Sequence, residues 1–303
     1  MLLISLAAAA ALAFQPAPAP AQPPPSDEAT VSGLVISAPP LDEKKAIESF
    51  VETIAADSGN GRIARWDRKV CPGVAGVKPE YAQLVADRMA ALSLKVGLEP
   101  GEPGCKVNVL VLFTADADAS VQRAMKSTPQ AFSRYDLEMT SGRKALRQFM
   151  NSDAPVRWWH VTHRVTEDGT RYNSGDQVQV YSTGRISSRT RDDFDRAIVV
   201  VDAKRVGQVR FAALADYIAF VSLAQIDPQA EPKTGSSILN LFADKSLGIE
   251  PSDGLTSWDI AYLTGVYEAR RDTRNSDGQK RDITRTMGKE LKEGEEGGDK
   301  PKE

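Results

Sequence analysis

The sequence has little of the chemistry on which most metal sites and nucleophilic enzymes depend, since it holds only two histidines and two cysteines in 303 residues. It contains no Gly-rich phosphate-binding loop, no Gly-x-Ser-x-Gly elbow and no Cys/His dyad, which argues against the enzyme classes that those motifs define. Positive and negative side chains nearly cancel, leaving a formal net charge of -3. The overall composition therefore indicates neither a nucleic-acid partner nor an anionic membrane surface.

The first residues lack Lys and Arg, and they form the apolar run MLLISLAAAAALA. This run is too short to span a bilayer as an anchor, and small residues suited to signal-peptidase cleavage follow it, so residues 1–21 are predicted to be a secretory signal. Cleavage is expected after Ala13 or after Ala21. The first cysteine is Cys71, which excludes a lipoprotein route. We therefore expect an exported chain, periplasmic or secreted, with no transmembrane anchor.

Both ends of the chain have compositions typical of unfolded segments. Residues 22–29 belong to a Pro/Ala-rich spacer that favours extended polyproline conformations. Residues 270–303 are rich in Gly, Lys and Glu with few large apolar side chains, which predicts a disordered mixed-charge tail. A single folded domain is therefore expected over residues 30–269.

The two cysteines, Cys71 and Cys105, each lie at a turn beside a strand-like segment. In an exported chain they are expected to form one disulfide, worth about 4 kcal/mol in the chain-entropy model. The alternative is a catalytic or metal-binding pair, but no histidine or second cysteine pair is close in sequence to support it.

Periodicity in the core predicts strands, then a central helix. An alternating pattern at 62–70 favours a strand, and the continuous apolar run at 106–114 favours a strand covered on both faces. Further predicted strands cover 156–165, 176–182 and 195–204. Predicted helices cover 78–98, 116–127, 141–152 and the almost wholly apolar segment 209–226. The excursion at 127–151 has no assignable role.

Three segments carry a family resemblance: ALADYIAFVSLAQ, SSILNLF and LTSWDIAYLTGVY. Together with the order of elements, they resemble a metzincin-type zinc-dependent peptidase. That family has a His-Glu-x-x-His-x-x-Gly-x-x-His helix, a Ser-Ile-Met turn and a C-terminal helix with a Leu-x-x-x-Asp-Ile pattern ending in Leu-Tyr. The matching positions here are Leu255, Asp259, Ile260, Leu263 and Tyr267, with Ser237, Ile238 and Leu239 at the turn.

The resemblance implies an α+β zincin-like fold. Its expected parts are a mixed twisted sheet with a long backing helix, a central former active-site helix and a C-terminal helix. The upper part would cover about 62–206 and the lower part 207–269. Leu239, Asp259 and Tyr267 would be the positions that hold this fold together.

The positions that carry the zinc ligands in the family have side chains of a different kind in this sequence. The three histidines fall on Ala215, Ala219 and Gln225, which cannot supply the donors that zinc needs, so no metal or cofactor is expected. The general-base position falls on Asp216, whose side chain is one methylene shorter than glutamate. Asp216 is a weak catalytic candidate; the alternative is a hydrogen-bonded or partly exposed carboxylate.

Four aromatic and imidazole side chains in VRWWHVTHRV are candidate binding residues. His160 and His163 would share a metal if they faced the same way, but strand positions three apart point to opposite faces. Trp158 and Trp159 are either a ligand platform or one core and one surface side chain.

Arginines in GRISSRTRDDFDR form the last candidate. Arg189 and Arg191, with Arg185 and Arg196, could grip a carboxylate or phosphate. The interleaved Asp192, Asp193 and Asp195 favour a self-neutralised solvated turn instead.

We hypothesise that the chain is an exported, non-catalytic peptidase-like protein with a binding or scaffold role in the cell envelope. The partner would be a protein, a peptide or another envelope component. The alternative is a hydrolase that acts on peptide or cell-wall substrates through an unrecognised site. A third class, a purely structural module, would have no cleft.

Overall fold

The computed structural model describes residues 43–58, 61–133, 140–166, 168–172, 176, 188, 190–243 and 251–298. These residues all belong to one compact unit, Leu41–Glu303. The predicted signal and spacer lie outside the described residues, as do Arg185, Arg189 and all but one residue of the strand predicted at 176–182.

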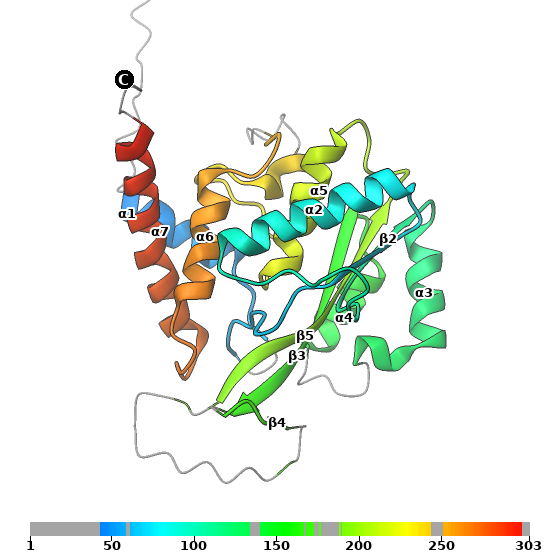
Figure 1. Ribbon diagram of the computed structural model, residues 1–303, viewed down its shortest axis with the longest axis horizontal. Helices are drawn as coiled ribbons and strands as arrows, with labels where there is room; N and C mark the ends of the chain where they lie inside the picture. The colour runs from blue at the N-terminus through cyan, green and yellow to red at the C-terminus, as the bar shows by residue number, and fades with distance from the viewer. Residues whose placement is uncertain are drawn as a thin grey trace, which may run out of the picture. The chain divides into compact units, whose positions relative to one another are not determined.

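A five-stranded mixed sheet lies at the centre of this unit, in the order β1-β2-β5-β3-β4 (Figure 1). Strands β1, β2 and β5 are parallel, whereas β3 is antiparallel to both of its neighbours. The mixed α+β class predicted from the sequence is confirmed. The bounds of the strands are β1 Pro72–Ala75, β2 Val109–Thr114, β3 Val156–Thr166, β4 Arg171–Tyr172 and β5 Thr190–Asp202.

Helices cover the two faces of the sheet, and the sheet separates the apolar interior into two clusters. The larger cluster packs one face against α2 (Pro79–Lys95) and α5 (Phe211–Leu223). The smaller cluster packs the opposite face against α3 (Ala117–Ser127), the 3-10 turn η1 (Pro129–Phe132) and α4 (Gly142–Met150). The α2 helix begins with a proline at its first position, as the sequence predicts.

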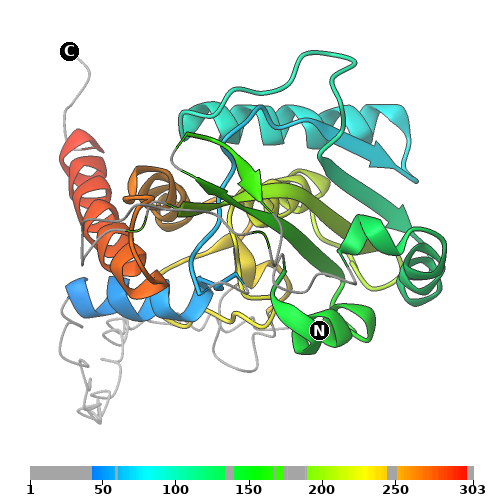
Figure 2. The ribbon, with the colours of Figure 1, turned by 90° about the horizontal axis from the view of Figure 1, so that it is seen from below.

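The C-terminal part adds the 3-10 turn η3 (Ile238–Phe242), α6 (Ser257–Glu268) and α7 (Ser276–Gly298). Helix α7 lies beside α6 and beside the N-terminal helix α1 (Glu43–Ile54), which the sequence analysis missed (Figure 2). The prediction of a disordered tail over 270–303 is therefore wrong for α7. The few apolar residues recur every fourth position, and Ile283 and Met287 are fully buried.

Two strand expectations also need correction. The segment 62–70 is not a strand; it makes only isolated bridges, from Arg65 to Asp193 and from Val70 to Pro100. Its backbone N–H groups at 63 and 64 are satisfied by the side-chain amides of Gln279 and Gln225. Strand β2 was expected to be covered on both faces. One of its faces is covered only in part, because Leu110 is 42% exposed.

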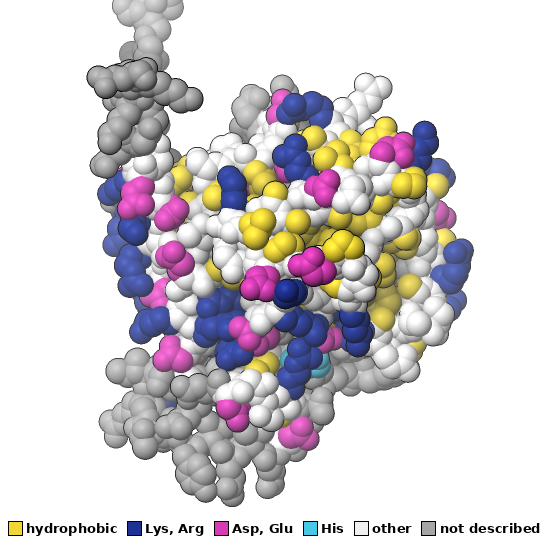
Figure 3. All heavy atoms as spheres, in the orientation of Figure 1, with side chains coloured by type: hydrophobic (Ala, Val, Ile, Leu, Met, Phe, Trp, Pro, Cys, Tyr) yellow, Lys and Arg dark blue, Asp and Glu magenta, His cyan; other side chains and the backbone are white. Residues whose placement is uncertain are grey.

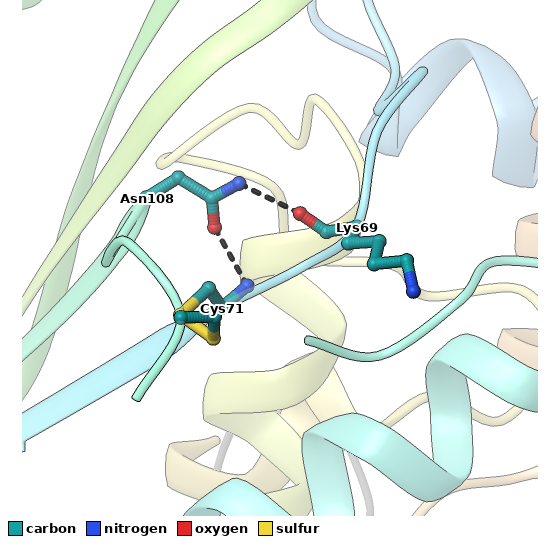
Figure 4. The surroundings of a disulfide bond; sticks show 4 residues. Lys69, Cys71 and Asn108 are labelled. Carbon is teal, nitrogen blue, oxygen red and sulfur yellow. Dashed lines mark hydrogen bonds between the residues drawn. A yellow bond between two sulfur atoms is a disulfide. The ribbon is translucent and has the colours of Figure 1, made fainter. Parts of the chain in front are cut away.

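The disulfide between Cys71 and Cys105 is present, as predicted, and it closes a loop with a sequence separation of 34 (Figure 4). Asn108 supports it: its Oδ1 accepts from the Cys71 backbone N at 2.7 Å and its Nδ2 donates to the Lys69 carbonyl at 2.9 Å. The link therefore ties the start of β1 to the segment that leads into β2.

Candidate functional site

Helix α5 has no accessible polar face. The three positions that correspond to zinc ligands are closed to solvent, with Ala215 and Ala219 fully buried and Gln225 1% exposed. The two alanines belong to the larger apolar cluster. The surroundings of these positions are therefore a packed junction, and a metal ion would find methyl groups where the family has imidazoles.

Gln225 serves the backbone rather than a ligand. Its Oε1 accepts from the Ala64 backbone N at 2.8 Å, and its own carbonyl accepts from the Ala56 backbone N at 3.0 Å. These two bonds join the segment after α5 to the segments that follow α1. Gln225 is thus a structural tie between parts of the chain distant in sequence.

Asp216, the weak catalytic candidate, faces α2. Its Oδ1 lies 3.4 Å from the Arg88 guanidinium. Burial raises the pKa of Asp216, while the nearby Arg88 charge opposes that rise. No histidine, cysteine or second carboxylate joins it among the described residues in a group able to hold a metal. Asp216 is 7% exposed and paired with Arg88, whereas the alternative given above was a hydrogen-bonded or partly exposed carboxylate.

The turn at 237–239 and the start of α6 are joined by Asp259. Its Oδ1 accepts from the Ser237 hydroxyl at 2.6 Å and its Oδ2 accepts from the Ile238 backbone N at 2.8 Å. Thr256 completes a capping box with the same carboxylate. Burial raises the pKa of Asp259, and these hydrogen bonds oppose the rise. Asp259 therefore fixes the turn against the helix, in the structural role expected from the resemblance.

Tyr267 fixes the other end of α6 to α5. Its hydroxyl donates to the Leu223 carbonyl at 2.6 Å, at the C-terminus of α5. Leu223 is one of the last residues of that helix, whose carbonyls have no partner inside the helix. Burial raises the pKa of Tyr267, so the hydroxyl stays a donor. Leu239, the third position of the structural set, is 8% exposed and packs with the larger cluster.

His160 and His163 lie on opposite faces of β3, as predicted. The His160 ring is stacked on Phe194 at 4.7 Å, and its Nε2 donates to the Val221 carbonyl at 2.9 Å. Burial lowers the pKa of His160 to about 4, so the ring is neutral at pH 7. His163 instead places its Nε2 3.2 Å from the Asp195 carboxylate. The two imidazoles cannot share one metal ion.

Trp158 and Trp159 are both buried, so the expectation of one core and one surface side chain is wrong. Their indole N–H groups donate to the carbonyls of Ile226 at 3.1 Å and Phe132 at 3.0 Å. Each face of β3 at this point is covered by helices, which is why neither ring reaches the surface. Trp158 alone lines a cavity, described below.

The described part of the Arg/Asp segment from residue 190 to 196 is not a solvated turn but the first half of β5. Asp192 and Asp193 are buried. Arg191 forms ion pairs with Asp193 at 3.1 Å and with Asp67 at 2.6 Å. Asp192 is buried against Arg62, whose guanidinium lies 3.1 Å from its Oδ1. The prediction that the arginines and aspartates of this segment neutralise each other is correct in part. Most of their ion-pair partners, however, come from elsewhere in the chain. The local hydropathy of the segment therefore could not show that its aspartates are buried.

A bulge in β5 gives Asp195 its position. Val161 of β3 pairs with Arg196 of β5, whereas the next residue, Thr162, pairs with Phe194. Asp195 is therefore the extra residue of the bulge. Its carboxylate contacts four basic side chains at 2.6 to 3.3 Å, those of Arg68, His163, Arg171 and Arg196. Burial raises its pKa, but hydrogen bonds from His163 and Arg196 outweigh that effect and hold the pKa well below its usual range.

A cavity of about 580 Å³ opens beside the start of β3. Its apolar wall holds an aromatic series in which Tyr217 contacts Trp158 at 6.0 Å and Phe242 at 5.3 Å between ring centroids. We call it the β3 cleft; its other lining residues include Val156, Leu239, Asn240 and Ala243. The sequence analysis named Trp158 and Leu239 but did not bring them together.

The outer edge of β3 borders this cleft. The Asp202 backbone N donates to the Pro155 carbonyl, and the register then directs the amides of 157, 159 and 161 towards β5. Val156, Trp158 and His160 direct theirs to the outer edge. Within the described residues that edge is paired only at Arg164 and Val165, by β4. Among the described residues the outer-edge backbone groups of Val156 and Trp158 thus have no strand partner, and both residues, 1% and 4% exposed, line the cleft.

These features define an α+β protein with a mixed sheet, a closed apolar helix packed against it and a cleft beside a strand edge. No family model matches the chain, and comparisons with curated proteins and with solved structures gave no significant match. Among the residues that the structure describes, no helix is long and apolar enough to cross a membrane.

Proposed function

We propose that the chain is an exported, non-catalytic, peptidase-like protein that binds an extended peptide segment of an envelope partner in the β3 cleft. The observation that carries the proposal is the outer edge of β3, which has no strand partner at Val156 and Trp158 among the described residues, beside the aromatic wall of Trp158, Tyr217 and Phe242. An extended peptide can add itself as a strand to such an edge, with side chains entering the adjoining pocket.

The metzincin-like architecture is part of this proposal. A long helix, α2, backs the mixed sheet, the apolar helix α5 is central, and Asp259 and Tyr267 tie the turn and α6 to it. The donor set argues against zinc hydrolysis, because Ala215, Ala219 and Gln225 offer no imidazole. Such a chain would retain the substrate groove of a peptidase without its chemistry.

The hydrolase alternative has less support. Among the described residues that line the β3 cleft, only Asp153 and Glu231 are acidic. The carboxylates with displaced pKa values that do lie in the sheet, Asp193 and Asp195, are held in ion pairs with arginines outside the cleft. A module without any cleft also fits less well, since a cavity of about 580 Å³ is present.

Selection of peptides from a random 12-residue display library on the purified full chain tests the proposal. We expect bound extended peptides whose affinity falls at least roughly tenfold in Ala243→Trp, which fills the cleft from its rim. The matched control Ala91→Trp, on the exposed side of α2, should bind like the native chain.

Metal analysis and a peptidase assay complete the test. We expect no stoichiometric zinc and no cleavage of the selected peptides. Zinc bound in stoichiometric amount, and lost together with hydrolytic activity in His160→Gln, would overturn the non-catalytic assignment. Equal peptide binding by Ala243→Trp and the native chain would overturn the assignment to the cleft.

A further inference from the structure

The sheet face that carries α3 and η1 is only partly covered, and its open part forms a second pocket of about 750 Å³. The pocket lies against the disulfide, and its floor includes Val107 and Leu110, which are 50% and 42% exposed. We call it the basic pocket, defined by Arg68, Lys69, Lys106, Val107, Leu110 and Arg196. It shares no lining residue with the β3 cleft.

Positive charge exceeds negative charge at this pocket, although the whole chain has a formal net charge of -3. Asp195 is the one carboxylate among its described lining residues, and four basic side chains already contact it. Lys69 has a further partner in Glu99, at 3.2 Å, on an exposed pair that solvent screens. Figure 3 shows Lys and Arg side chains, with Asp and Glu side chains among them, in the lower part of this view, and an apolar area above them.

The floor of the pocket suits an aliphatic chain better than a peptide. Leu110 lies in β2, which is paired on one side with β1 and on the other with β5, where Ile198 is its neighbour. The backbone donors and acceptors of the floor at Leu110 and its neighbours in β2 are therefore already used. A peptide lying there would leave its own amides unpaired, whereas an acyl chain has none to satisfy.

We propose that the basic pocket binds a single anionic phospholipid, with its phosphate among Arg68, Lys106 and Arg196 and an acyl chain over Val107 and Leu110. Arg68 contacts the Asp195 carboxylate through Nη2, and Arg196 contacts it through Nε and Nη2. The remaining guanidinium N–H groups and the Lys106 ammonium are the donors for the phosphate. Apolar contact with the exposed aliphatic floor supplies the rest of the affinity. The site does not depend on the peptide cleft.

Calorimetric titration of the full chain with monomeric dioctanoyl phosphatidylglycerol tests this site. We expect one lipid per chain, bound at least roughly tenfold more tightly than dioctanoyl phosphatidylcholine, whose choline cation meets the basic rim. Glycerol 3-phosphate, which has the charge without the chains, should bind at least about tenfold more weakly as well.

Paired variants separate the two parts of the site. The double variant Lys69→Glu/Lys106→Glu changes exposed side chains, and Leu110→Thr replaces the apolar side chain with a β-branched residue that strands favour; each should weaken lipid binding roughly tenfold. The matched controls Lys45→Glu on α1 and Leu94→Thr on α2 should bind as the native chain does. Circular dichroism confirms that each variant is folded.

Several outcomes would overturn the proposal. These are no binding of the anionic lipid, equal affinity for the two lipids, and equal affinity for glycerol 3-phosphate. Retention of full affinity in Lys69→Glu/Lys106→Glu would also do so, as would tighter binding of an acidic peptide at the same residues.

Discussion

At the scale of single residues, burial and partners decide what each titratable side chain does. Asp259 and Asp195 are both carboxylates with low exposure, yet burial raises the pKa of one, while hydrogen bonds from cations lower the pKa of the other. The difference follows from their partners: hydroxyl and amide donors around Asp259, charged donors around Asp195. Neither carboxylate is placed for general acid–base work in the β3 cleft.

His160 should make the folded state sensitive to acid. Its folded pKa of about 4 lies below the value of 6.5 for an unperturbed histidine, so between these values the unfolded chain takes up a proton that the folded chain does not. Stability should therefore fall as pH falls from 6.5 to 4, by about 3 kcal/mol at most. Urea unfolding at a series of pH values measures this loss.

The variant His160→Gln keeps a donor for the Val221 carbonyl and removes the titration. The difference in unfolding free energy between the native chain and this variant should change over pH 6.5 to 4. His163→Gln, on the opposite face of β3, is the histidine control and should retain the native loss. An unchanged pH dependence in His160→Gln would contradict the assignment.

At the scale of elements, the C-terminal helix shows how few apolar residues are needed when their spacing is right. In α7, Ile283 and Met287 are fully buried, and the small Gly265 of α6 leaves room for Ile283. A Cβ at Gly265 would lie 3.0 Å from the Ile283 side chain. The composition of 270–303 is polar, but one face of the helix is not.

Removal of α7 should destabilise the chain. Truncation after Asn275 exposes the surfaces that cover Ile283 and Met287 and breaks the Gln279 bonds to the backbone of Ile63. Loss of two fully buried side chains predicts about 3 to 6 kcal/mol. Thermal or urea unfolding of the truncated chain measures the loss; removal of residues 299–303 alone is the control. A truncated chain as stable as the native one would show that α7 does not support the fold.

At the scale of the whole molecule, the disulfide is the covalent constraint that joins β1 to the chain before β2. The double variant Cys71→Ser/Cys105→Ser should lose about 4 kcal/mol of unfolding free energy, because the unfolded chain regains the freedom of a closed loop. Urea unfolding with and without reductant measures it. Reductant should lower the stability of the native chain and leave that of the double variant unchanged; no effect on either would contradict the estimate.

Much of the fold could be predicted because its signals are local. The proline at the start of α2 and the glycine at 97 mark the limits of that helix, and β3 follows its aromatic and β-branched residues. Local signals could not show that the segment 62–70 is not a strand. Its alternation is real, but the partners of its backbone are the side chains of Gln225 and Gln279, far along the chain.

The candidate sites were harder to predict than the fold. Trp158 and Leu239 were singled out separately, but only the packing of α5 and η3 beside β3 places them on one cleft. The arginine cluster was noticed as well, yet the basic pocket depends on Arg68 and Lys106, which carried no pattern of their own. A cleft is a relation between elements, so a linear pattern does not contain it.

Two conclusions needed only the order of the residues: the side chains of Ala215, Ala219 and Gln225 cannot form a zinc site, and Cys71 and Cys105 pair because they are the only two cysteines. Tertiary structure alone decided that the run of arginines and aspartates enters the central sheet. Local hydropathy records what each side chain prefers in isolation. Burial of a charge depends instead on a partner such as Arg62, which only folding brings to Asp192.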